Sequence, residues 1–114
     1  MSDEITAAIQ RFHDALNAHD IDAVERSITD DCVFEDTTPP DGTRHVGRAA
    51  MLEAVRKFFA DSPASRFTIE DMFTAGDRAM VQWRYSWADG HVRGVDVMRV
   101  ADGRVAESFA YVKG

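Results

Sequence analysis

The chain has 114 residues, with 13 Lys and Arg against 20 Asp and Glu and a formal net charge of −7 at pH 7. Nucleic acids and anionic membrane surfaces are bound through clustered cationic side chains, so this balance argues against both as partners. The length fits a single domain over residues 1–114. With neither a basic leader nor an apolar run of about 20 residues, a cytoplasmic protein is expected.

The first half of the chain predicts three helices and one strand. Apolar side chains recur with a helical period over residues 5–16, which predicts a long amphipathic helix. Asp20 has the position of an N-cap for a short helix over residues 21–28, and Gly47 precedes a third helix that ends near Asp61. Between the last two helices, residues 32–36 predict a short strand that stops at a Thr-Thr-Pro-Pro loop.

The second half predicts a succession of antiparallel strands. They cover residues 67–73, 79–87, 92–100 and 105–112. Asp-Gly dipeptides are typical of tight hairpins because both turn residues need a positive φ, and they occur at Asp89-Gly90 and Asp102-Gly103. The predicted register therefore places Ala88 opposite His91 and Ala101 opposite Arg104.

This register divides the predicted sheet into two unlike faces. The aromatic and apolar face, which the helices should cover, carries Val81, Trp83, Tyr85, Trp87, Val92, Asp96, Met98, Val105, Glu107, Phe109 and Tyr111. Asp96 and Glu107 are the exceptions on it, and a carboxylate in an apolar patch is costly unless it is protonated, paired or bonded to a ligand. The other face, with Gln82, Arg84, Val95, Val97, Ala106 and Ala110, predicts a homodimer interface.

The order helix, helix, strand, helix and curved antiparallel sheet resembles the fold of nuclear transport factor 2 and its relatives. The segments ITAAIQRF (5–12), ALNAHD (15–20) and DDCVFED (30–36) are similar to the opening of bacterial ketosteroid isomerases. The segment GVDVMRV (94–100), followed by DGRVAE (102–107), is similar to the SnoaL-like branch, which includes polyketide cyclases. The resemblance implies an α+β fold with a cone-shaped, curved antiparallel sheet packed against three N-terminal helices.

The resemblance also implies roles for two acids. Asp36 matches the carboxylate with which the isomerases move a proton between carbons, and Asp96 matches their protonated aspartic acid, which hydrogen-bonds the enolate oxygen. Phe12 departs from the pattern, because the isomerases have a tyrosine donor there and phenylalanine has no hydroxyl. Efficient steroid isomerisation is therefore not expected.

Each acid also has a purely structural interpretation. Asp36 fits an acid that bonds the backbone of the two residues after it, as aspartates do at turns. Asp96 fits an acid bonded to the indole nitrogen of Trp83 or to another strand neighbour, and Glu107 fits a rim residue that holds Arg104 or a helix end. The four histidines lack the spacing of a metal site, so no metal is predicted. No motif implies an organic cofactor either.

The sequence thus predicts a pocket protein that transfers a proton next to the carbonyl of a small hydrophobic substrate, as an isomerase or a polyketide cyclase does. Asp36 is the predicted base and Asp96 the predicted oxyanion acid. The predicted substrate-binding residues are Phe12, His13, Phe34, Trp83, Tyr85, Met98, Glu107, Phe109 and Tyr111. His45, in the loop after Asp36, fits either a second polar group of the pocket or a solvated histidine.

Two alternatives stay open. An epoxide hydrolase of the limonene type would need an arginine on the acid face of the sheet, whereas the predicted register turns Arg93 and Arg99 to the other face. A non-catalytic binding or stress-related module would be favoured by an Asp36 that is ionised, solvated and capped by backbone, together with a pocket too shallow for a ligand.

Overall fold

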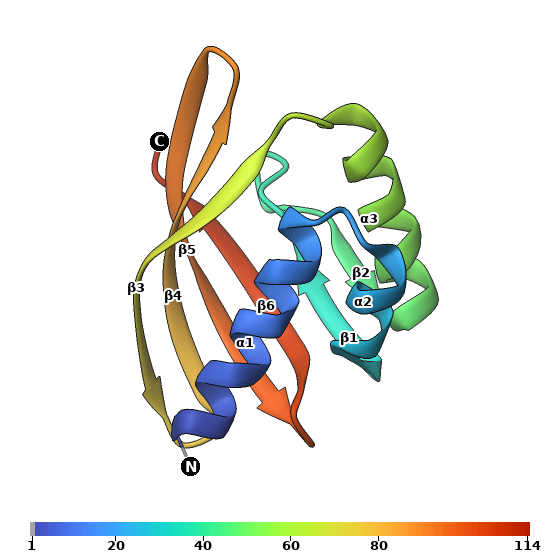
Figure 1. The fold of residues 1–114 in the computed structure, drawn as a ribbon, viewed down its shortest axis with the longest axis vertical. Coiled ribbons are helices and arrows are strands. Elements are labelled where there is room, and N and C mark those ends of the chain that lie inside the picture. The colour runs from blue at the N-terminus through green and yellow to red at the C-terminus, as the bar shows by residue number, and fades with distance from the viewer. Residues whose placement is uncertain (1) are drawn as a thin grey trace.

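The computed structural model describes residues 2–114, and within them the chain forms three helices and one six-stranded sheet (Figure 1). The elements are α1 (Ser2–Asn17), α2 (Ile21–Arg26), β1 (Ile28–Glu35), β2 (Arg44–Val46), α3 (Arg48–Asp61), β3 (Arg66–Ala75), β4 (Arg78–Trp87), β5 (Gly90–Ala101) and β6 (Arg104–Val112). The strand order is β2-β1-β6-β5-β4-β3. Strands β1 and β6 run parallel, and the other neighbours are antiparallel.

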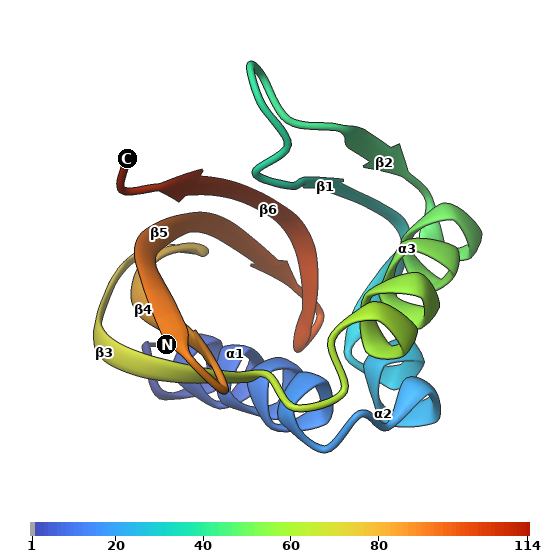
Figure 2. The ribbon, with the colours of Figure 1, turned by 90° about the horizontal axis from the view of Figure 1, so that it is seen from above.

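The predicted α+β architecture is confirmed. Figure 2 shows strands β3 to β6 curving around an interior that α1 closes on one side, while α2 and α3 lie beside β1. The core joins the inner face of this sheet to the apolar sides of the helices. Among the described residues, no helix combines the length and the apolar character needed to cross a membrane.

The apolar stripe of α1 faces the sheet as its periodicity predicts. Ile9 and Ala8 are almost fully buried, and Phe12 is 3% exposed. At the C-terminal end of α1, the Asn17 amide donates to the Phe67 carbonyl and accepts from the Phe67 N–H, both at 2.8 Å. These two bonds satisfy the backbone N–H and carbonyl groups of Phe67 at the edge of the sheet, and they hold β3 against α1.

The segment between α2 and α3 differs from the prediction. Asp20 caps α2, since its Oδ1 accepts from the Ala23 N–H at 3.1 Å, but the helix ends at Arg26 and Ile28 already begins β1. The aspartates of residues 30–31, which precede the predicted strand, lie inside β1. Strand β2 was not predicted at all. It has three residues and is held by its pairing with β1, which no local pattern reveals.

The β4–β5 hairpin has the predicted faces despite a different turn. Trp87 pairs with Gly90, so the turn residues are Ala88 and Asp89 and the register is shifted by two positions from the prediction. A shift of two keeps every side chain on its face, because side chains alternate with a period of two. Asp96 therefore still lies on the inner face, opposite Val81.

The β5–β6 hairpin starts in the predicted register and then changes it. Its Asp102-Gly103 turn has positive φ values of 53° and 73°, as the sequence predicts. Val100 pairs with Val105, but the next pair joins Arg99 to Glu107. Ala106 is therefore an extra residue in β6, a β-bulge, and it reverses the facing of every later side chain of this strand.

The bulge makes three of the sequence predictions wrong. Glu107, Phe109 and Tyr111 lie on the outer face of the sheet, not on the inner one. Ser108 and Ala110, expected outside, face inward and line the interior cavity. The predicted homodimer face accordingly lacks Ala110 and gains three larger side chains.

Candidate active site

A cavity of about 320 Å³ lies between the inner face of the sheet and helices α1 and α3. Its wall consists mainly of apolar side chains and includes six aromatic rings besides one imidazole. The lining residues are Phe12, Leu16, Phe34, Glu35, Asp36, Thr37, His45, Met51, Ala54, Val55, Phe58, Phe67, Trp83, Tyr85, Val92, Asp96, Ser108 and Ala110. Such a wall, with few polar groups, is typical of a site for a small organic molecule.

The strand pairing brings the two predicted acids to one face of this cavity. Asp96 pairs with Ala110 across β5 and β6, and Glu35 pairs with Phe109 across β1 and β6. Asp36, one residue beyond Glu35, is thus level with Ala110. Both side chains line the same cavity.

Asp96 lies in the cavity wall beside Trp83. Burial raises the pKa of its carboxyl from 3.8 to about 7, although hydrogen bonds from the Trp83 indole and the Ser108 side chain act in the opposite direction. The indole Nε1 donates to Asp96 Oδ1 at 3.0 Å. This bond is the one anticipated by the structural interpretation of Asp96, and it also fixes the carboxyl in place. At neutral pH a large fraction of Asp96 is protonated and able to donate a hydrogen bond.

Gly94 determines the position of the Trp83 ring. These residues pair across β4 and β5, and the ring lies over the position where a Cβ of residue 94 would be. A Cβ there would be 2.5 Å from the Trp83 side chain and would overlap the Tyr111 carbonyl oxygen. The missing side chain lets the indole lie across β5 and reach Asp96.

Asp36 has a different environment at the mouth of the cavity. Its Oδ1 accepts from the backbone N–H groups of Thr43 at 2.7 Å and Thr38 at 3.0 Å, and its side chain is 44% exposed. Partial burial raises the pKa, but the two N–H donors, the Thr38 side chain and His45 outweigh it, so the pKa of Asp36 lies below 3.8. Asp36 is thus the backbone-capped carboxylate of the structural interpretation.

The loop around Asp36 depends on Gly42. This glycine has a φ of 81°, and a Cβ on it would overlap the Asp36 carbonyl oxygen. Thr43, which follows it, both donates to the Asp36 side chain and accepts from the Asp36 N–H at 3.1 Å. The loop therefore closes on Asp36 and holds its carboxylate in one orientation.

His45 lies on β2, not in a loop, and its side chain is 22% exposed. It pairs with Phe34 of β1, so it shares the inner face of the sheet and lines the cavity. Its Nε2 is 3.3 Å from Asp36 Oδ2. The structure thus supports the first of the two interpretations of this histidine, as a polar group of the pocket.

The predicted binding residues divide into three groups. Phe12, Phe34, Trp83 and Tyr85 line the cavity. His13 and Met98 are buried beside it without lining it. The outward-facing residues Glu107, Phe109 and Tyr111 make other contacts: Glu107 pairs with Arg99 and Arg78, the Arg44 guanidinium lies over the Phe109 ring, and Tyr111 is 59% exposed.

His13 is a buried histidine whose ring nitrogens have no hydrogen-bond partner within residues 2–114. The His13 ring packs in T-shaped geometry against the rings of Phe12 and Phe67, at centroid distances of 5.7 and 6.0 Å. Burial lowers the pKa of His13 from 6.5 to about 4, against the opposing charge of Asp14. The side chain is therefore neutral at pH 7 and belongs to the core.

Ser108 is a polar residue of the site that sequence reasoning missed. It is 4% exposed and lies beside Asp96 in the cavity wall. Its inward orientation follows from the bulge at Ala106, which carries no local signal in the sequence. Ser108 brings a hydroxyl to the cavity wall, whereas Phe12, which also lines the cavity, has none.

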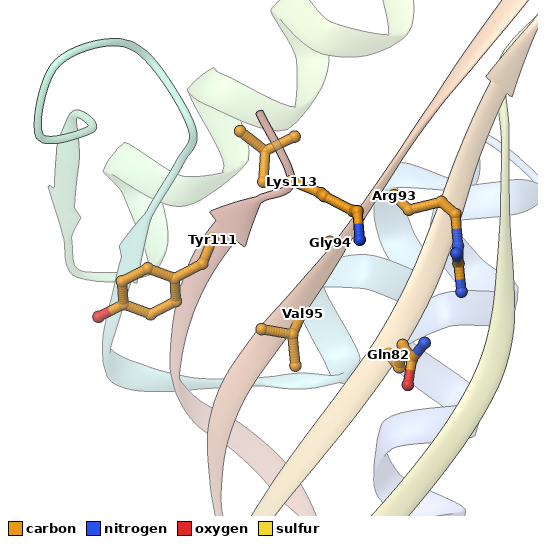
Figure 3. Close-up of a pocket in the computed structure, with 7 residues that line it drawn as sticks. Gln82, Arg93, Gly94, Val95, Tyr111 and Lys113 are labelled. Carbon is orange, nitrogen blue, oxygen red and sulfur yellow. The ribbon is translucent and has the colours of Figure 1, made fainter.

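A second hollow, also of about 320 Å³, lies on the outer face of the sheet (Figure 3). Its lining residues are Gln82, Arg93, Gly94, Val95, Tyr111, Val112 and Lys113. In Figure 3 the Tyr111 ring extends away from Gln82 and Arg93, so these side chains do not converge on one point. The inner cavity, with its two acids and aromatic wall, is the better candidate for a site.

No group of three or more His, Cys, Asp or Glu side chains within residues 2–114 is arranged to hold a metal ion. The polar side chains of the inner cavity are instead spread over four strands and the β1–β2 loop, with Asp96 separated from Asp36 and His45.

The model of the SnoaL-like domain matches residues 9–108 of this sequence. The chain belongs to the SnoaL-like family. The matched range contains Asp36, His45, Asp96 and Ser108, so the candidate site lies within the SnoaL-like domain. Among curated protein sequences, none matches the chain.

Several solved structures are similar to this chain. A protein of unknown function from Mesorhizobium loti, related to nuclear transport factor 2, is 46% identical, with a TM-score of 0.86 over 99% of this chain and 93% of its own. Two proteins with provisional names share the fold of this SnoaL-like domain at lower identity. One, from Kribbella flavida, is named a ketosteroid isomerase and is 21% identical (TM-score 0.84, 98% of this chain and 79% of its own). The other, from Sinorhizobium meliloti, is named a polyketide cyclase and is 24% identical (TM-score 0.80, 91% and 93%).

Proposed function

We propose that this protein binds a small, largely hydrophobic carbonyl compound and transfers a proton at the carbon next to the carbonyl. The observation that carries the proposal is Asp96: a carboxyl with a pKa of about 7, held by Trp83 in an aromatic wall and facing the cavity that Asp36 and His45 also line. A neutral carboxyl donates a hydrogen bond to a developing enolate oxygen, which an ionised one repels.

The proposed reaction needs no external reactant. A base at the cavity mouth removes a proton from the carbon next to the carbonyl, and the electron pair of the broken C–H bond forms an enolate whose oxygen accepts from Asp96. Return of the proton to another carbon completes an isomerisation. Attack of the enolate carbon on a second carbonyl of the same molecule would give an aldol-type cyclisation instead, with the proton passed to the new alkoxide. Both reactions use the same two groups of the site.

The size and the lining of the cavity also favour one class of substrate. A volume of about 320 Å³ holds a compact molecule of one or two rings, and six aromatic side chains favour a flat, apolar one. Phe12 offers this molecule no hydroxyl, so Ser108 is the proposed second donor beside Asp96. The provisional names of the structural relatives are in keeping with this chemistry.

The test uses a β,γ-unsaturated cyclohexenone, whose isomerisation to the conjugated enone is followed by ultraviolet absorbance. Asp96→Ala should lower kcat by about 100-fold or more, the usual effect of removing one oxyanion donor. Asp71→Ala, which removes an exposed acid of β3 outside the cavity, is the matched control and should retain the parental rate. In the parent, kcat/KM should fall as the pH rises through about 7, because ionisation removes the donor proton of Asp96.

A naphthol serves as a second probe, since its phenolic oxygen mimics the enolate. Its fluorescence should report binding that weakens in Asp96→Ala and not in Asp71→Ala. A parent that neither isomerises the enone nor distinguishes these variants in naphthol binding would contradict the proposal.

The second candidate function is a non-catalytic ligand-binding module, and one observation favours it. Asp36 is 44% exposed, ionised and capped by two backbone N–H groups, which makes it a weak base. Naphthol binding without turnover would support this candidate. Epoxide hydrolysis has less support, because within residues 2–114 no arginine lines the cavity and Arg93 and Arg99 pair with Glu70 and Glu107.

A further inference from the structure

We propose that His45 is the proton acceptor of this site and that Asp36 is a positioning residue that orients the imidazole. The inference rests on the proposed function and assigns a role within it. It differs from the sequence prediction, in which Asp36 itself is the base.

The first step concerns the lone pairs of Asp36. Its Oδ1 already accepts two backbone hydrogen bonds, from Thr38 and Thr43, inside a loop that closes around it. Accepting a substrate proton there would break both bonds. The lowered pKa of Asp36 agrees with this geometry, since a carboxylate stabilised in its ionised form takes up a proton reluctantly.

The second step concerns the other oxygen of Asp36, Oδ2, which is 3.3 Å from His45 Nε2. An ionised carboxylate only accepts hydrogen bonds, so Nε2 carries the hydrogen of this contact. A neutral imidazole has one N–H, and Nδ1 is then left with a lone pair that can accept a proton. This is the logic by which a buried aspartate orients a catalytic histidine in hydrolases.

The third step concerns the location of the imidazole. His45, Phe34 and Ser108 form one row across β2, β1 and β6 on the inner face of the sheet. Ala110 and Asp96 pair in the neighbouring row, and Asp36 directly follows Glu35 at the end of β1. A molecule whose carbonyl reaches Asp96 therefore extends along the wall toward His45, and 22% exposure leaves the imidazole accessible from the cavity mouth.

The first measurement is independent of any substrate. Nitrogen-detected correlation spectra of the histidine side chains above their titration range should show His45 as the Nε2–H tautomer in the parent. Asp36→Asn introduces an amide N–H₂ that donates to Nε2, so this variant should show a gain of the Nδ1–H tautomer. His91, an exposed histidine of β5, should not change. An Nδ1–H tautomer of His45 in the parent would overturn the inference.

The second measurement is turnover of the β,γ-unsaturated cyclohexenone. His45→Gln keeps a side chain that can bond Asp36 but lacks the base, and should lower kcat by about 100-fold or more with a small change in KM. Asp36→Asn should lower kcat through the altered tautomer of His45, and His91→Gln should match the parent. Turnover that depends on Asp96 but survives His45→Gln, while Asp36→Asn abolishes it, would overturn the inference and leave the proposed function intact. A parent with the Nε2–H tautomer and no turnover would support the pairing and contradict the proposed function.

Discussion

Replacing Asp96 by asparagine measures the free energy with which the fold resists ionisation of this side chain. The carboxyl has a pKa of 3.8 in the unfolded chain and about 7 in the folded one, a difference that corresponds to about 4 kcal/mol between its two protonation states. Because the folded pKa is the higher one, the stability from Asp96 is complete below 3.8 and is lost as the pH rises through about 7. Asparagine keeps the oxygen that accepts from Trp83 and cannot ionise.

Asp96→Asn should therefore match the parent at about pH 4 and exceed its stability by about 2 to 4 kcal/mol at about pH 8. The lower end of this range allows for water in the cavity, which would screen the charge of an ionised Asp96. In urea unfolding followed by tryptophan fluorescence, a difference of this size shifts the midpoint by about 1 to 2 M. Comparing the two proteins at each pH removes the contribution of every other titrating group, His13 included.

Asp36→Asn is the matched control, because the pKa of Asp36 is shifted the other way. The stability from Asp36 is present above 3.8 and is lost as the pH falls through its lower folded pKa. This variant should lose about 1 kcal/mol at neutral pH, a small effect because the side chain is 44% exposed, and approach the parent in acid. If Asp96→Asn instead destabilised the protein at about pH 8, Asp96 would be an ionised and paired aspartate, and the oxyanion role would be refuted.

Three further predictions concern two residues near the site and the outer face of the sheet. Gly94→Ala should destabilise the protein by about 1 to 3 kcal/mol in urea unfolding, because the added methyl group overlaps the Tyr111 carbonyl oxygen and the Trp83 ring. The NMR signal of the Trp83 indole N–H should also lose the shift typical of its bond to Asp96. An unchanged signal would contradict the proposed role of the glycine. His13→Leu should stabilise the protein most in acid. The stability from neutral His13 is present above pH 6.5 and is lost as the pH falls through about 4, a change of about 3 kcal/mol. If the free energy of unfolding had the same pH dependence in variant and parent, His13 would not be buried in its neutral form. We also expect a homodimer through the outer sheet face, and light scattering at micromolar concentration that gave a mass near 12.7 kDa would contradict it.

Local patterns in the sequence determined most of the elements and most of the inner face of the sheet. The stripe of α1, the cap at Asp20 and the turn at Asp102-Gly103 depend on neighbouring residues only, so they could be predicted from the sequence. The inward position of Asp96 was predicted correctly although the β4–β5 register was shifted, because a shift of two residues preserves the alternation of side chains. The composition and the order of the predicted helices and strands were also sufficient to predict the α+β fold.

The tertiary structure decided which polar groups meet in the cavity. The bulge at Ala106 turns Ser108 inward and Glu107 outward, and it depends on how β6 fits between two strands, not on its own residues. Strand β2 forms only by pairing with β1, and that pairing brings His45 to Asp36. The ionisation of the two acids follows in the same way. Backbone N–H groups of a closed loop bond Asp36, whereas Asp96 is buried between β4 and β6, with Trp83 and Ser108 beside it. Protonation depends on the local environment in three dimensions, and residues far apart in the sequence create that environment.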